Sequence, residues 1–389
     1  MILNSIKNID LRNKRVFLRV DYNVSLNSDN SISDDTRITQ TLPTIKHLLD
    51  GGAGLILASH LGRPGGKVDK KYSMNVVATR LSEYLGKKVR VIPDYWKGKI
   101  IVNSGEVVML ENLRFNSGEE GNDPKLAEYI SRFADIYVND AFGSSHRAHM
   151  SIVGIARHLP SYAGLLLEKE ITLIDKLLNK RKGSLTVVIG GAKTPEKIGV
   201  IDNLLSKADT LLLGGAVANT FLATWGIKTG VSLVDHEMIE MARQIMWKAT
   251  QSSARLILPE DFVVSNTKQT REPVEVSYKK VPGHLAIYDI GRGARTKYTD
   301  EILSSDYVIW NGPMGLFEKP QFAAGTKCVM EAMVRCNGTT VIGGGDTLTA
   351  LQDKEQLDHI THISTGGGAL LEYLEKESLP GIDIIKKHK

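Results

Sequence analysis

A glycine-rich corner near the end of the chain holds residues whose types point directly to chemistry. Residues 339–342 form an apolar β-branched run, and three glycines, Asp346, Thr347 and a helical pattern follow it. Glycine lets backbone N–H groups approach a ligand without a Cβ atom, and a helix start adds partial positive charge. The corner suits phosphate, and the carboxylate of Asp346 is compatible with phosphate if a cation lies between them. This indicates a metal-bound nucleotide phosphate, although a loop that only closes a tight turn has the same sequence.

A second group of candidates is mostly basic and lies in the first half of the chain. Apolar runs at 16–20, 55–58, 107–110 and 136–138 each end in a polar loop. A single exposed arginine is more often a solvated surface charge than a ligand group. Several basic groups at the same end of successive strands instead indicate an anion site, since the guanidinium fork matches phosphate and carboxylate. The polar residues in or just after these loops are Asp21, Asn23, Arg37, His60, Arg63, Arg114, His146, Arg147 and His149.

Two of these histidines, His146 and His149, could also be interpreted as a metal pair. No nearby residue completes a ligand set for them. A role at a helix start or in anion binding is therefore favoured.

The second half of the chain repeats the strand-then-helix rhythm, but its strands end in glycine. Runs at 185–189, 210–213, 307–310, 339–342 and 362–363 lead into glycine-rich corners and helical patterns. Such corners present backbone donors suited to a nucleotide. Lys193 and Lys197 lie on either side of Pro195, a residue favoured at the first helical position, so both ammonium groups are expected near one helix start. A solvated lysine pair is the ordinary alternative.

Alternating strands and helices predict the elements that must position these residues. Helical patterns are expected at 41–49, 75–85 and 164–178. The pattern predicts an α/β fold of two doubly wound parallel-sheet (Rossmann-like) lobes, in which ligands lie beyond the carboxyl ends of the strands. We expect an N-terminal lobe at 1–163, an interdomain helix or hinge at 164–182 and a C-terminal lobe at 183–375. A tail at 376–389 is expected to pack back on the N-terminal lobe.

Composition excludes several classes of protein. Cys328 and Cys336 fit neither a disulfide framework nor a paired zinc-ligand pattern. The N-terminus lacks a signal-peptide layout, and no apolar stretch approaches the roughly 20 residues of a membrane span. The net charge of +5 is spread too thinly to indicate nucleic acid. We therefore expect a cytoplasmic protein with a small acidic substrate and neither a membrane nor a nucleic-acid partner.

Common nucleotide signatures are missing from the sequence. No Gly-Lys pair is followed by Ser or Thr, no Gly-x-Gly-x-x-Gly opens a helix, and the protein-kinase catalytic loop is absent. This weakens a nicotinamide-dependent dehydrogenase, which remains one alternative. A non-catalytic anion or nucleotide sensor is the other.

Taken in order, the loops resemble one family, phosphoglycerate kinase. Each stretch is a weak signal alone, but the ordered set covers nearly the whole chain and is specific. The stretches are RVDYNVSL (19–26), SHLGRP (59–64), LENLRF (110–115), NDAFGSSHRAH (139–149), GGAK (190–193), LGGAVANTF (213–221), WNGPMGLFE (310–318), GGGDT (343–347) and STGGGALLEYLE (364–375). The sequence departs from the family's usual residues at Ser25, Met150, Thr194, Pro195 and Arg292, none of which has an implied role.

The resemblance implies reversible transfer of a phosphoryl group from 1,3-bisphosphoglycerate to MgADP, giving 3-phosphoglycerate and MgATP, by a monomer. It implies that Arg37 and Lys193 are catalytic and that Asp346 holds magnesium. The residues implied to bind phosphoglycerate are Asp21, Asn23, Arg37, His60, Arg63, Arg114 and Arg147. Those implied to bind the nucleotide are Lys193, Lys197, Gly214, Gly215, Gly291, Asn311, Glu318, Gly344, Gly345, Asp346 and Thr347.

The chemistry of this reaction agrees with the residue types at the strand ends. A carboxylate nucleophile with a pKa of roughly 3.3–3.7 is already ionised at pH 7, so a general base adds nothing. Positioning and charge then carry catalysis, as in phosphoryl transfer generally. Because water competes for the phosphoryl group, the lobes are expected to close over their ligands by a hinge motion.

Overall fold

The computed structural model describes the chain apart from residues 1–2, 181, 270–271, 351–353 and 387–389, and apart from the side chains of Lys180, Asp346, Thr349 and Lys354. It divides into two compact units. Unit 1 comprises Met1–Ile174 and Ser378–Lys389, and unit 2 comprises Asp175–Glu377. The lobe, hinge and tail boundaries given above remain predictions.

Unit 1 is built on a six-stranded sheet in the order β5-β6-β4-β1-β7-β8, and every neighbouring pair is parallel. Strands β4 and β7 are buried along their whole length, which explains the apolar sequence of β4 and of the first three residues of β7. The strands are β1 (Arg15–Val20), β4 (Gly54–Ala58), β5 (Arg90–Ile92), β6 (Val107–Leu110), β7 (Ile136–Asp140) and β8 (Ser161–Ala163). A short hairpin, β2 (Ser25–Leu26) and β3 (Ile32–Asp34), follows β1.

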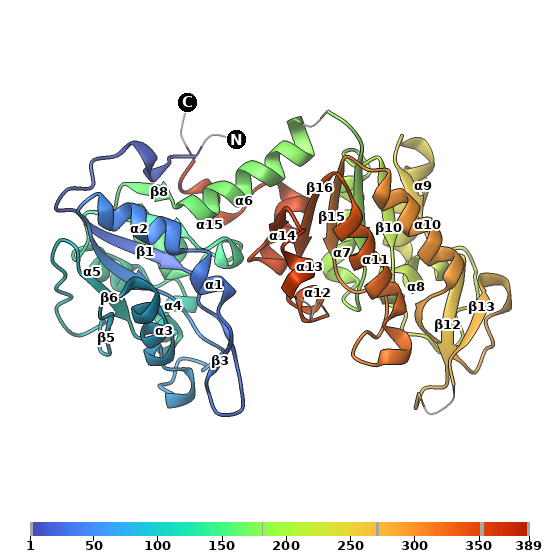
Figure 1. Ribbon diagram of the computed structural model, residues 1–389, viewed down its shortest axis with the longest axis horizontal. Coiled ribbons are helices and arrows are strands. Elements are labelled where there is room, and N and C mark those ends of the chain that lie inside the picture. Colours follow the sequence, from blue (N-terminus) through green and yellow to red (C-terminus); the bar gives the residue numbers. More distant parts are fainter. Residues whose placement is uncertain (1–2, 181, 270–271, 351–353, 387–389) are drawn as a thin grey trace. The chain divides into compact units, whose positions relative to one another are not determined.

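Helices pack around this sheet (Figure 1). Helix α2 has a proline in its first turn, and α3 ends at Gly86 in the left-handed conformation, so both follow local start and stop signals. The α-helices of unit 1 are α1 (Thr36–Thr39), α2 (Leu42–Asp50), α3 (Asn75–Leu85), α4 (Ser117–Glu120), α5 (Pro124–Ser131), α6 (Leu165–Asp175) and α15 (Pro380–Asp383). Helix α15 is held to unit 1 by the backbone N–H of Gly381, which donates to the carbonyl of Ser145 at 2.9 Å.

Unit 2 has its own six-stranded parallel sheet, in the order β11-β10-β9-β15-β16-β17. Its register aligns the ends of four strands, because Ile189 pairs with Leu213 and Asn311, and Asn311 pairs with Gly343. The strands are β9 (Leu185–Ile189), β10 (Thr210–Leu213), β11 (Arg255–Ile257), β15 (Tyr307–Asn311), β16 (Thr339–Gly343) and β17 (His362–Ile363). The two parallel sheets confirm the predicted α/β fold of two lobes.

The helices of unit 2 follow the strands in the rhythm that the sequence predicts. Helix α7 has Pro195 at its start, as the preference of proline for the first helical position predicts. The α-helices are α7 (Pro195–Leu204), α8 (Gly215–Thr224), α9 (Ile239–Gln251), α10 (Arg292–Leu303), α11 (Ala324–Arg335), α12 (Gly345–Thr349), α13 (Lys354–Leu357) and α14 (Gly367–Lys376).

A small antiparallel sheet in unit 2 was not predicted from the sequence. Its order is β13-β12-β14, with bounds Asp261–Ser265 for β12, Val274–Ser277 for β13 and Ala286–Ile290 for β14. The pairing of β12 with β14 is interrupted by a register shift between Val263 and Val264. Strand preference depends strongly on the partner strands, so these segments were not recognised from their own residues.

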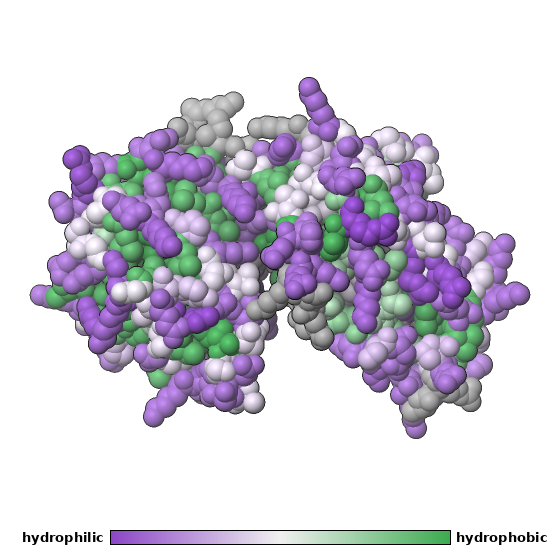
Figure 2. Space-filling model, viewed as in Figure 1, coloured by the Kyte–Doolittle hydropathy of each residue, from purple (hydrophilic) through white to green (hydrophobic). Residues whose placement is uncertain are grey.

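Hydrophilic side chains cover much of the face seen in Figure 2, with smaller apolar areas between them. Each sheet has a buried apolar core beneath that surface. Within the described residues, none of the helices combines the length and the apolar character that crossing a membrane requires.

Candidate functional site

The strand ends of unit 1 gather the predicted polar residues because the register places those ends side by side. Arg19 on β1 pairs with Ala58 on β4 and with Asn139 on β7. Asp21 therefore follows β1 beside the point where His60 follows β4. Arg114 comes from a short 3-10 helix, Leu113–Phe115, that follows β6.

Asp21 and Arg37 form an ion pair at this edge. The Arg37 Nη1 atom lies 2.7 Å from Asp21 Oδ1, and the Asp21 side chain is buried. Burial raises the pKa of this carboxyl, but Arg37, His60 and Arg19 outweigh it and hold the pKa below its ordinary value. The Asn23 amide oxygen accepts a hydrogen bond from the Gly62 N–H at 2.8 Å. Asp21 and Asn23 are thus fixed in place, and Asp21 stays ionised.

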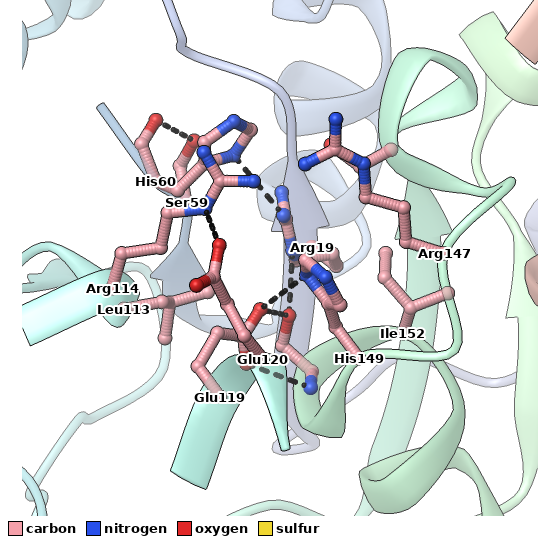
Figure 3. A network of polar contacts seen from close by, with 12 residues as sticks. Arg19, Ser59, His60, Leu113, Arg114, Glu119, Glu120, Arg147, His149 and Ile152 are labelled. Atoms are coloured by element: carbon pink, nitrogen blue, oxygen red, sulfur yellow. Dashed lines mark hydrogen bonds and ion pairs between the residues drawn. The ribbon is translucent and has the colours of Figure 1, made fainter. Parts of the chain in front are cut away.

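The predicted phosphate-binding side chains differ in how the structure holds them. Arg114 is almost completely buried, donates from Nη1 to the carbonyl of Gly62 at 2.8 Å, and has Nε 3.0 Å from Glu120 Oε1. Burial lowers its pKa. Arg147 is half-buried and donates from Nε to His146 Nε2 at 3.1 Å. Arg63 is exposed, whereas Arg19, His60 and Arg114, which Figure 3 shows together, are buried.

Three residues of this network were missed by sequence reasoning. Arg19 is fully buried on β1 and donates from Nε to Ser151 Oγ at 2.8 Å. Glu119 is fully buried and accepts from the Ser151 hydroxyl at 2.7 Å. The one available signal was a charged residue, Arg19, inside the apolar sequence of β1, because a buried charge needs a partner.

The two predicted lysines of unit 2 lie in different environments. Lys193 is exposed, with Nζ 3.6 Å from Glu196 Oε1. Lys197 is buried, and its ammonium donates to the carbonyl of Gly190 at the end of β9. The sequence placed both near one helix start, and the structure makes Lys197 part of the glycine corner while Lys193 reaches solvent.

Gly215 brings two glycine corners of unit 2 into contact. It opens α8 with a φ of 61°, and a Cβ atom there would lie 2.7 Å from the backbone nitrogen of Gly191. Its N–H donates to the carbonyl of Met314 at 3.0 Å, and the N–H of Gly191 donates to the carbonyl of Pro313 at 2.7 Å. Only glycine fits this approach, so the ends of β9, β10 and β15 meet here backbone to backbone.

Beside these corners lies a cavity of about 570 Å³. That volume is within the range of small-ligand sites. Of the predicted nucleotide residues, Gly215 and Glu318 line it, and Lys193, Lys197, Gly214, Gly291, Asn311, Gly344, Gly345 and Thr347 do not. One wall comes from β14, through residues such as Tyr288, whose ring stacks on Phe322 with centroids 4.8 Å apart.

Asp289, on the same wall, is a buried carboxyl that the sequence analysis did not select. Its Oδ2 accepts from the Gly325 N–H at 2.7 Å and its Oδ1 from the Ile290 N–H at 2.9 Å. Burial raises the pKa of Asp289 to about 7, against the effect of these hydrogen bonds. Asp289 thus joins β14 to the first turn of α11.

The remaining nucleotide candidates mostly hold the backbone of the corners. Thr347 Oγ1 accepts from the Gly312 N–H at 2.7 Å, and Asn311 Nδ2 donates to the carbonyl of Gly343 at 2.9 Å. Gly214 and Gly291 precede the first turns of α8 and α10. Gly344 has a φ of 111°, and α12 begins at the exposed Gly345.

The predicted metal ligand, the side chain of Asp346, lies outside the described residues. Within the part of the chain that the structure describes, no three His, Cys, Asp or Glu side chains form a metal-binding group. The pair His146 and His149 accordingly gains no further ligand there.

Comparisons with known proteins agree over the whole chain. The family model described as phosphoglycerate kinase matches residues 6–377. A phosphoglycerate kinase of Desulforudis audaxviator (strain MP104C) is 44% identical over 392 residues, which covers 99% of this chain and 100% of the relative. A solved phosphoglycerate kinase from Coxiella burnetii is 37% identical with a TM-score of 0.88, and one from Pyrococcus horikoshii OT3 is 33% identical with a TM-score of 0.83. Each alignment covers 98% of both chains.

Proposed function

Because this chain belongs to the phosphoglycerate kinase family, we propose that its two units divide one reaction, with phosphoglycerate bound by unit 1 and the nucleotide by unit 2. The reaction is the glycolytic one, reversible phosphoryl transfer between 1,3-bisphosphoglycerate and ADP. The dehydrogenase alternative is thereby rejected. The observation that carries the proposal is the contrast between the two sets of strand ends, guanidinium-rich in unit 1 and rich in backbone N–H groups in unit 2.

In unit 1, the substrate's charged groups match the side chains at the strand ends. Asp21, held by its ion pair with Arg37, and Asn23 are assigned to the hydroxyl and carboxyl end of phosphoglycerate. The non-transferring phosphate is assigned to His60, Arg63, Arg114 and Arg147. Arg63 is exposed and Arg147 half-exposed, so both side chains are open to a ligand arriving from solvent. Charge-assisted hydrogen bonds from such groups are each worth roughly 1.5–3 kcal/mol.

In unit 2, the cavity of about 570 Å³ is assigned to the nucleoside, with Glu318 at its edge suited to the ribose hydroxyls. Lys197, at the glycine corner, is assigned to the nucleotide phosphates. Gly214, Gly215, Gly291 and Asn311 shape the surrounding backbone. The glycine corner of residues 343–345 and the start of α12 supply N–H groups for the terminal phosphates.

Catalysis is proposed to rest on charge without a general base. The attacking carboxylate is ionised at neutral pH, so its reaction needs neutralisation of the oxygens on the transferring group. Arg37 from unit 1 and Lys193 from unit 2 are assigned to that task. Lys193 is suited to it because its ammonium is exposed and pairs only loosely with Glu196.

Magnesium is the proposed cofactor, held by the Asp346 carboxylate and the nucleotide phosphates. A Cβ atom built at Gly345 would meet nothing within 4 Å, and that space fits a phosphate and its cation. A bound magnesium ion would neutralise phosphate charge during transfer. We further propose that the protein works as a monomer in the cytoplasm. Sedimentation of the purified chain tests whether it is a monomer.

Hydrogen exchange with each ligand alone tests the division of labour. We expect 3-phosphoglycerate to protect amides of unit 1 near residues 21–23 and 60–63, and MgADP to protect unit 2 near residues 190–193 and 312–318. Protection of the same unit by both ligands contradicts the proposal.

The transfer also requires the two bound ligands to meet, so we propose that binding both draws the units together through a hinge. Small-angle scattering should then show a smaller radius of gyration with both ligands than with either one. An unchanged radius contradicts closure. A coupled assay for ATP formation on the same samples separates a failure of closure from a failure of activity.

A further inference from the structure

A buried chain of polar groups connects Glu119 to His60 through Ser151 and Arg19. Ser151 Oγ lies 2.7 Å from Glu119 Oε1, and Arg19 Nε lies 2.8 Å from Ser151 Oγ. At the far end, Arg19 Nη2 lies 3.4 Å from His60 Nδ1. Figure 3 shows Arg19 between Glu119 and His60. Three members of this hydrogen-bonded series are fully buried: Glu119, Ser151 and Arg19. These three residues therefore belong to the protein interior and not to its ligand surface.

The direction of each hydrogen bond in this chain follows from which atoms carry protons. Burial alone would raise the pKa of Glu119, but His149, Arg19 and Ser151 hold it below its usual value, so this carboxylate only accepts. The one hydroxyl proton of Ser151 therefore goes to Glu119, and Ser151 Oγ accepts from Arg19 Nε. Arg19 Nη1 donates to the carbonyl of Val20, which fixes the plane of the guanidinium.

The contact between Arg19 Nη2 and His60 Nδ1 decides which nitrogen of His60 carries the proton. A guanidinium has only donors, so the Nδ1 atom of His60 can take part only if it carries no proton. We propose that Arg19 is a positioning residue that holds His60 as a neutral imidazole with its proton on Nε2. Within the described part of the chain, Nε2 makes no hydrogen bond, which leaves its N–H for a ligand.

The charged groups around His60 support the neutral form. Burial disfavours an imidazolium most, Asp21 favours it, and Arg19 from β1, Arg114 from the 3-10 helix after β6 and Arg37 from α1 disfavour it. With burial as the largest cause, the pKa of His60 lies well below its ordinary value. The arginines already supply positive charge at this edge. His60 then adds a directional N–H donor that stays constant over physiological pH.

This inference rests on the proposed function where it gives the Nε2–H a phosphoglycerate oxygen as its acceptor. The tautomer itself rests on unit 1 alone. The tautomer of His60 and its hydrogen bond to the substrate can therefore be tested separately on one set of samples.

Nitrogen NMR of the full chain labelled with 15N-histidine tests the tautomer directly. The chain has ten histidines, and the signals of His60 are identified by their loss in His60→Asn. At pH 7 we expect one protonated nitrogen, Nε2, and one bare nitrogen, Nδ1, unchanged from about pH 5.5 to 8, the range in which ordinary histidines titrate. An Nδ1-protonated ring or an imidazolium at pH 7 overturns the proposal.

The variant Ser151→Ala tests whether the buried hydrogen bonds from Glu119 to Arg19 set the tautomer of His60. It removes the hydroxyl between Glu119 and Arg19, so we expect a mixture of His60 tautomers and an upward shift of its titration. The KM for 3-phosphoglycerate should rise about fivefold, as for the loss of one neutral hydrogen bond, with kcat little changed. Ser145→Ala is the matched control, because Ser145 is also fully buried but its hydroxyl contacts Asn139 and the carbonyl of Ala141.

Wild-type His60 signals in Ser151→Ala would overturn the role of Arg19 as a positioning residue. If Ser151→Ala does not fold, the wild-type spectrum still decides the tautomer, and Arg19→Lys, which keeps the charge but loses the fork, replaces it. If the tautomer is as stated but His60→Asn leaves the KM for 3-phosphoglycerate unchanged, the assignment of His60 to the substrate fails and the inference about Arg19 stands.

Discussion

The variant Gly215→Ala should damage both the stability of unit 2 and its nucleotide site. An L-residue at a φ of 61° costs roughly 1–2 kcal/mol. In addition, the new Cβ atom would lie 2.7 Å from the nitrogen and 2.8 Å from the oxygen of Gly191, both backbone atoms. Moving a packed backbone typically adds about 1–3 kcal/mol. The total is about 2–5 kcal/mol, and the displaced Gly191 lines the cavity assigned to the nucleoside.

Gly226→Ala is the matched control for this variant. Gly226 has a similar φ of 71°, but a Cβ atom there meets nothing within 4 Å, and the residue is not part of the cavity lining. It should lose only the roughly 1–2 kcal/mol of backbone strain and keep its affinity for ADP.

Urea unfolding and ADP titration compare the two variants. The fluorescence of Trp310, which is fully buried in unit 2, reports the unfolding of that unit. Gly215→Ala should unfold at clearly lower urea than Gly226→Ala and bind ADP at least tenfold more weakly, about 1.4 kcal/mol. Equal urea midpoints for both variants, or wild-type ADP affinity in Gly215→Ala, would show that the close approach of Gly215 to Gly191 supports neither the fold nor the nucleotide site.

Three further predictions concern charged residues. The pKa of Asp289 is about 7 in the folded protein against an ordinary 3.8. The contribution of Asp289 to the free energy of unfolding is therefore complete below about pH 4 and is lost as pH rises through 7. The loss is on the order of 4 kcal/mol over this range. Between about pH 5 and 8, the free energy of unfolding measured in urea should therefore fall less for Asp289→Asn than for the wild type. An equal fall in both proteins contradicts the raised pKa. Arg63→Ala should weaken the binding of 3-phosphoglycerate about tenfold or more without changing the melting temperature. Arg114→Ala should lower both the affinity for 3-phosphoglycerate and the melting temperature, because Arg114 is buried against Gly62 and Glu120. Titration and thermal unfolding check the two variants, and equal melting temperatures contradict the prediction. Arg37→Ala leaves the buried Asp21 unpaired, so it should raise the KM for 3-phosphoglycerate as well as slow turnover, and steady-state kinetics with an unchanged KM would count against the pairing.

Local signals in the sequence predicted the parallel sheets well. Strands β9 and β10 have the predicted bounds, because each is a mainly apolar run that ends directly before a glycine. Helix α3 also has the predicted bounds, and Gly86 ends it in the left-handed conformation that glycine favours. Where a boundary depends on a residue's own conformational preference, the sequence is sufficient.

Contacts between distant residues explain what the sequence did not predict. Ser151 lies 132 positions from Arg19, so no local pattern reveals that this buried charge is satisfied. Strands β12 and β14 are as long as β9, but each is ordered by a distant antiparallel partner, as where Phe262 pairs with Ile290, and with them the wall that carries Tyr288 and Asp289 was missed. Lys193 and Lys197 look equivalent in sequence, and only the position of the Gly190 carbonyl makes Lys197 the buried one.

We propose that fixed positive charge, and not proton transfer, drives the chemical step. Lys193→Met tests it most directly, because Lys193 is exposed and its removal should leave the fold intact. With both substrates saturating, single-turnover ATP formation should fall about 10²–10³-fold, as for the loss of one preorganised charged donor, with ADP affinity nearly unchanged. Lys376→Met, which removes another exposed lysine of unit 2, should match the wild type. A wild-type single-turnover rate in Lys193→Met would show that the charge of Lys193 does not act in the chemical step.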